Sequence, residues 1–158
     1  MAIQPKEKGR KSASRGRKPA GETAATVEQM YNISGHWLSD IRFFADELNF
    51  FRLLIDKNLM WLTDDNHIDD TRKMVSDLKY LDAEGKRLEG RLKVHFGHLE
   101  ELVENPFAHD EFSCREEQRE LGEMIFDYMK KFRQTKKTVF RHAEEVLETE
   151  KASHLLTP

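Results

Sequence analysis

Apolar residues spaced alternately three and four positions apart recur through almost the whole chain after residue 26. This spacing keeps one stripe of an α-helix facing a partner helix, and three stretches each sustain it for about four heptads or more. Charged residues fill the positions between. The sequence therefore predicts an all-α protein, an antiparallel three-helix bundle of long, coiled-coil-like helices. The three stretches run from Val27 to Leu62, from Met74 to Leu102 and from Cys114 to Val146.

Candidate caps and breakers set the expected ends of these helices. Thr26 with Gln29 and Ser113 with Glu116 have the spacing of capping boxes, in which a hydroxyl and a side-chain carbonyl or carboxylate satisfy backbone donors at a helix start. Pro106 cannot continue a helix. We expect a disordered arm and one bundle domain, with these bounds: arm 1–25, bundle 26–158, helices about 27–62, 70–105 and 114–152.

Composition bounds the class of protein. Of 158 residues, 38% are hydrophobic and 35% are charged, which is typical of long amphipathic helices in a single domain. No apolar run approaches the length of a membrane span, and no apolar segment follows the first charges as in a secretory signal. The single Cys114 cannot form an internal disulfide. We therefore expect a cytoplasmic protein without a membrane partner.

The charge is unevenly distributed along the chain. Residues 1–20 carry seven basic side chains against one acidic side chain, although the whole chain has a net charge of −3. A mobile basic arm binds phosphate polymers by releasing their counterions. We expect DNA or RNA, or another acidic surface, as its partner; the alternative is a leader that only keeps the protein soluble. The candidate contact residues are Arg10, Lys11, Arg15, Arg17 and Lys18.

One segment of the arm, residues 15–19, reads Arg-Gly-Arg-Lys-Pro. It resembles the AT-hook, whose Arg-Gly-Arg-Pro core lies in the minor groove of A·T-rich DNA. The resemblance covers five residues and departs from the core at Lys18, which precedes the proline. It implies that Arg15 and Arg17 would enter the groove.

Two groups of polar residues fall on or beside the apolar stripes. Short connections make neighbouring helices antiparallel, so facing residues have numbers that sum to about 132 between the first two helices and about 215 between the last two. This rule places Asn58 and His142 in one layer, where we expect a hydrogen bond between them that selects the register. It also gathers five metal-capable residues near the other end: His36, His95, His98, Cys114 and Glu117.

Imidazole, thiolate and carboxylate groups together suit zinc or iron, so a metal-binding bundle is the alternative function. The spacing lacks the repeated ligand pairs of bundle metalloproteins, and we expect no cofactor. No catalytic motif is present, and Cys114 has no neighbouring base in the sequence.

The sequence therefore predicts a non-enzymatic interaction or scaffold module. Many large apolar residues lie outside the stripes, more than a closed three-helix bundle needs, and exposed apolar surface marks interfaces. We expect them to bind a helical protein partner or a second copy of the chain.

Overall fold

The computed structural model describes residues 24–58, 62–63 and 65–156. Its regular structure consists of three helices: α1 (Val27–Lys57), α3 (Ile68–Glu104) and α4 (Glu111–Leu156). No strand occurs within these ranges. The predicted all-α three-helix bundle is confirmed. The predicted arm lies almost entirely outside the described residues.

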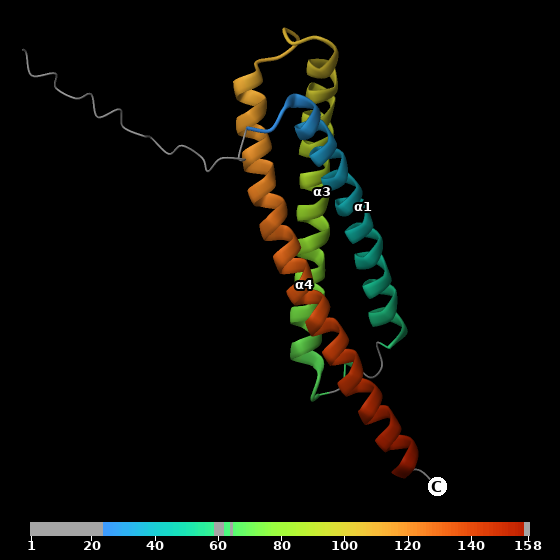
Figure 1. The fold of residues 1–158 in the computed structure, drawn as a ribbon. Helices are drawn as coiled ribbons and strands as arrows, with labels where there is room; N and C mark the ends of the chain where they lie inside the picture. Colours follow the sequence, from blue (N-terminus) through green and yellow to red (C-terminus); the bar gives the residue numbers. More distant parts are fainter. Residues whose placement is uncertain (1–23, 59–61, 64, 157–158) are drawn as a thin grey trace, which may run out of the picture.

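The helices lie lengthwise side by side, and the C-terminal end of α4 extends beyond the connection between α1 and α3 (Figure 1). α3 runs antiparallel to both of its neighbours, so α1 and α4 are parallel. Cross-helix pairs follow the predicted numbering to within one turn. They are Arg42 with Glu89 and Arg52 with Asp82 between α1 and α3, and His95 with Gln118 between α3 and α4.

The core follows the repeat closely. Every repeat position of the second stretch, from Met74 to Leu102, is buried in α3, including Gly85 and His95. In α4 the only repeat position that is not fully buried is Gln118. α1 is less regular, because Leu38 is buried while the neighbouring Trp37 is only partly buried.

The helix ends agree with the predicted caps in part. Thr26 and Gln29 form the expected capping box at the start of α1. α1 ends at Lys57 and not near residue 62, because Asn58 takes the C-cap position and its Nδ2 donates to the carbonyl of Leu54 at 2.8 Å. An asparagine side chain competes well for backbone groups at a helix end.

α4 begins one turn earlier than predicted. The carboxylate of Asp110 accepts hydrogen bonds from the backbone N–H and the hydroxyl of Ser113, at 3.2 and 2.6 Å. Asp110 thus acts as the N-cap, and the predicted capping box of Ser113 with Glu116 is wrong. Aspartate is a strong N-cap residue, and because Asp110 precedes Ser113 in the chain, the helix begins earlier than predicted.

α1 and α4 stand farther apart than either stands from α3. Large aromatic rings fill the space between them. The ring centroids of Phe44 and Phe132 lie 4.5 Å apart, and those of Phe51 and Phe140 lie 5.7 Å apart. Rings of this size keep two backbones apart while still excluding water. This side of the bundle is therefore closed by large side chains, with the two backbones farther apart than elsewhere.

Candidate functional site

Apolar side chains follow the side of the bundle that lies between the parallel helices α1 and α4. Phe44 and Met129 among them are partly buried against the core. Phe43 and Phe50 remain 59% and 55% exposed, which is unusual for side chains of this size. We call this surface the α1–α4 valley; it comprises Phe44, Leu54, Met129, Phe140 and Leu147, together with Phe43 and Phe50 on the outer face of α1 beside it.

The valley ends in a pocket beside the end of α1. The pocket has a volume of about 230 Å³. Its lining is almost entirely aliphatic, and its few polar groups come from Lys57 and Asn58 at the end of α1. The apolar lining is Leu54, Ile55, Leu62, Met74, Val139, Ala143, Val146 and Leu147. A pocket of this kind suits a large aliphatic or aromatic side chain.

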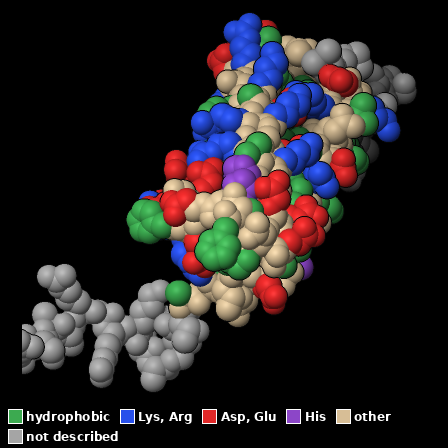
Figure 2. Space-filling view, turned by 90° about the horizontal axis from the view of Figure 1, so that it is seen from above, with side chains coloured by type: hydrophobic (Ala, Val, Ile, Leu, Met, Phe, Trp, Pro, Cys, Tyr) green, Lys and Arg blue, Asp and Glu red, His purple; other side chains and the backbone are tan. Residues whose placement is uncertain are grey.

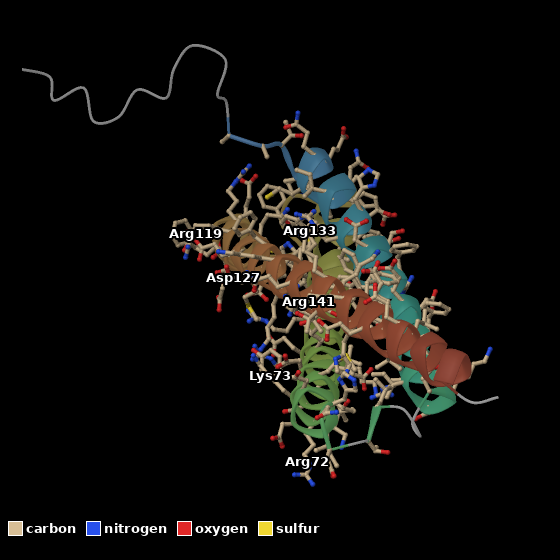
Figure 3. All side chains as sticks on the ribbon, turned by 90° about the horizontal axis from the view of Figure 1, so that it is seen from below. Arg72, Lys73, Arg119, Asp127, Arg133 and Arg141 are labelled. Carbon is tan, nitrogen blue, oxygen red and sulfur yellow. The ribbon has the colours of Figure 1, made fainter. Side chains whose placement is uncertain are left out.

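The two rims of the valley carry opposite charges. On α1, Asp40 and Asp46 are exposed and lie three residues before and after Phe43, so they flank it on opposite sides. Asp46 follows Arg42, which pairs with Glu89 of α3, by one turn, so only Asp40 belongs to the side that faces α4. On α4, Lys137 is exposed and lies three residues before Phe140. Arg133 follows Met129 by four residues, and Figure 3 shows Arg133 and Arg141 along α4. The α1 rim is thus acidic and the α4 rim basic.

One ion pair crosses the valley floor. Lys136 Nζ lies 2.9 Å from a carboxylate oxygen of Glu47, and both side chains are partly buried. This pair joins the two rims at mid-length. The pair neutralises one charge on each rim. The exposed charged side chains of both rims remain in contact with solvent.

A second apolar surface lies at the connection between α3 and α4. Phe107 is 93% exposed and Phe112 is 70% exposed. Figure 2 looks onto this end of the bundle and shows hydrophobic side chains protruding among acidic ones. The two rings protrude, and neither of them lines the pocket beside this connection.

A polar layer crosses the core near the N-terminal end of α1. The hydroxyl of Ser34 donates to Oε1 of Gln118 at 2.8 Å, and Nε2 of His95 bonds the same oxygen at 2.6 Å. Each helix contributes one of these side chains. Burial lowers the pKa of His95, so its ring is neutral at physiological pH. A neutral ring that donates from Nε2 has a lone pair on Nδ1, and this atom is buried without a partner.

The expected hydrogen bond between Asn58 and His142 is wrong. Asn58 bonds Leu54 on its own helix, whereas Nε2 of His142 lies 3.1 Å from the hydroxyl of Thr71. His142 does belong to a buried polar layer, but its partner is on α3. Asn58 lies at the edge, because α1 has already ended there.

The five residues of the expected metal cluster are only partly brought together. His95, His98, Cys114 and Glu117 line one pocket, but His36 is exposed and is not part of it. Among the described residues, no three of these five have ligand atoms within 4.8 Å of one another.

Two of these five residues, Glu117 and Cys114, are also poorly suited to bind a metal ion. Both carboxylate oxygens of Glu117 accept from Arg91 at 2.9 Å. Burial raises the pKa of the Cys114 thiol, so it is neither a ready ligand nor a nucleophile.

The remaining predicted contact residues are Arg10, Lys11, Arg15, Arg17 and Lys18, and all five lie outside the described residues. Thr71, the partner of His142, was not predicted from the sequence. It lies three residues before Met74 and so continues the repeat, but the repeat was defined by apolar residues and threonine is polar.

The fold defines a three-helix bundle with an apolar surface between α1 and α4. Comparison of the chain with protein families, curated proteins and solved structures gives no match. None of the helices in the described part of the chain is both long and apolar enough to cross a membrane.

Proposed function

We propose that this protein is a non-enzymatic interaction module whose α1–α4 valley binds an amphipathic helix of a protein partner. The observation that carries the proposal is the row of exposed aromatic residues along two parallel helices, ending in an aliphatic pocket. A helix laid in this valley would occupy the fourth position of a bundle. Such docking of an apolar helix face into a groove is a common mode of peptide recognition.

The rims specify the charges of the partner helix. The edge lying against α1 faces Asp40 and should be basic, whereas the edge lying against α4 faces Arg133 and Lys137 and should be acidic. Complementary charges of this kind select the orientation and speed encounter more than they add affinity. The apolar face should present a large side chain to the pocket at the valley's end.

Photo-crosslinking in cells tests this proposal. A crosslinking amino acid in place of Phe50 of the full-length chain should capture a partner segment with one acidic and one basic edge. The same amino acid in place of Ala83, which is exposed on α3, should not capture it. Charge reversal of the α4 rim, Arg133→Glu with Lys137→Glu, should reduce capture at least tenfold.

Other outcomes contradict the proposal in distinct ways. A crosslink from position 50 to a second molecule of this protein would identify a second copy as the occupant. Equal capture at positions 50 and 83 would show that the valley has no role in recognition.

The basic arm is the second part of the proposed module. Its seven basic residues would hold nucleic acid, or another acidic surface, beside the partner bound in the valley. The described helices carry many carboxylates, so they would contribute little to this contact. The arm therefore acts as a tether and the bundle as the recognition element.

Binding of full-length protein to DNA and RNA should depend on the arm. Replacing Arg10, Lys11, Arg15, Arg17 and Lys18 by glutamine should abolish binding to a short duplex in a fluorescence-anisotropy titration. Affinity of the unaltered chain should fall with rising salt. A preference for A·T-rich over G·C-rich duplex would support the AT-hook resemblance. Unchanged affinity of the substituted chain would contradict the tether.

A further inference from the structure

We infer that the end of the bundle opposite the predicted metal cluster contains a zinc site formed by His67, His142 and Glu145. Each of these residues can present a ligand atom within 4.8 Å of the other two, the only such trio in the described part of the chain. His67 precedes α3, and the other two lie one turn apart on α4. The ring centroids of the two histidines are 5.3 Å apart.

Hydrogen bonds fix the state of the buried histidine. The hydroxyl of Thr71 donates to the carbonyl of Leu62 at 2.7 Å, so toward His142 it can only accept. Nε2 of His142, 3.1 Å away, must therefore carry a hydrogen. If the ring is neutral, its other nitrogen, Nδ1, has a lone pair. Nδ1 is the atom that faces Glu145.

The lone pair on Nδ1 of His142 faces a carboxylate oxygen of Glu145. Nδ1 of His142 lies 3.9 Å from a carboxylate oxygen of Glu145. A metal ion between these two atoms could bind both of them. A third ligand atom, from His67, belongs to the same group. Three converging donors favour a metal ion.

The chemistry of the three groups favours zinc. Two imidazoles and one carboxylate form a ligand set that Zn²⁺ accepts, with one position left for water or a fourth ligand. A metal-bound histidine usually donates its other N–H to a fixed acceptor, and the bond from His142 to Thr71 supplies one. His142 is only 4% exposed, so its ring is held in place.

The ligand atoms must move closer together to bind the ion. Zinc bonds of about 2.0–2.2 Å bring tetrahedral ligands to within about 3.5 Å of one another. The Glu145 side chain is 53% exposed and can make this movement without disturbing the core. A bound ion would join the segment before α3 to the end of α4.

Zinc titration of untagged, metal-free, full-length protein tests the site. We expect one equivalent of Zn²⁺ by calorimetry, a raised unfolding temperature, and intense visible absorption when Co²⁺ is the probe. Glu145→Gln and His67→Gln should each weaken zinc binding at least tenfold. Glu144→Gln and His36→Gln are matched controls on exposed residues and should leave the affinity unchanged.

Several outcomes would overturn the inference. Absence of stoichiometric zinc binding would show that these three residues do not form a zinc site. Binding that survives both Glu145→Gln and His67→Gln but is lost in His98→Gln would place the ion in the pocket at the other end. Both results would leave the proposed valley function untouched, because the valley experiment does not depend on metal.

Discussion

Replacing Gln118 by leucine should lower the free energy of unfolding by about 3 kcal/mol, one of the two largest effects we expect. The change removes the oxygen that accepts from both Ser34 and His95. Leaving a buried donor without an acceptor costs about 1–3 kcal/mol. Ser34 can turn to a backbone carbonyl of its own helix, so most of the loss should come from His95.

A triple replacement distinguishes the free-energy cost of leaving polar groups unpaired from the cost of lost packing. Ser34→Ala, His95→Leu and Gln118→Leu together remove every member of the layer, so no donor remains unsatisfied. Removal of both partners is often nearly neutral, and we expect stability within about 1 kcal/mol of the unaltered chain.

Urea unfolding followed by circular dichroism measures both variants. Gln134→Leu, on the exposed face of α4, is the control and should change stability by less than about 0.5 kcal/mol. A Gln118→Leu protein as stable as this control would show that the layer is reached by water.

Alanine at Gly85 should destabilise the protein, although alanine favours helices. A Cβ there would lie 2.9 Å from the hydroxyl oxygen of Tyr128, which is buried on α4. Overpacking of this kind typically costs about 1–3 kcal/mol, more than the gain of about 1 kcal/mol in helix propensity. Gly90→Ala is the matched control on the same helix: its Cβ meets nothing within 4 Å, so it should stabilise the protein.

Tyr128→Phe should reverse the effect of the alanine. The hydroxyl that it removes has no hydrogen-bond partner, and burial raises its pKa to about 12. Without that oxygen the nearest ring atom lies 3.4 Å from the new Cβ, an ordinary contact. In this background Gly85→Ala should behave like Gly90→Ala, which corresponds to a coupling of about 1–3 kcal/mol, the overpacking cost that is relieved. Additive effects in the unfolding measurements would contradict the direct contact.

The repeat predicted the fold because helix period is a local property. Its positions in α3 are buried without exception, including Gly85, which faces Tyr128. The end of α1 was predicted wrongly, since Leu62 keeps the repeat although the helix has stopped at Lys57. Apolar spacing alone does not show where a cap interrupts a helix.

The candidate surfaces were harder to predict than the core. The surplus of apolar residues was visible in the sequence, but which of them lie between α1 and α4 depends on the spacing of these helices, and that spacing depends on how aromatic rings pack. The trio of His67, His142 and Glu145 was missed because His67 lies outside every helix. No periodicity relates such a residue to α4.

The central place of α3 also bears on how the chain folds. α3 contacts both neighbours extensively, whereas α1 and α4, which are farthest apart in sequence, contact each other least. Most native contacts can therefore form by closing two successive helical hairpins. Such low contact order is associated with folding on the order of microseconds to milliseconds. The same topology leaves α4 attached to the rest mainly through one helix, so its opening would expose the valley floor without unfolding the α1–α3 hairpin.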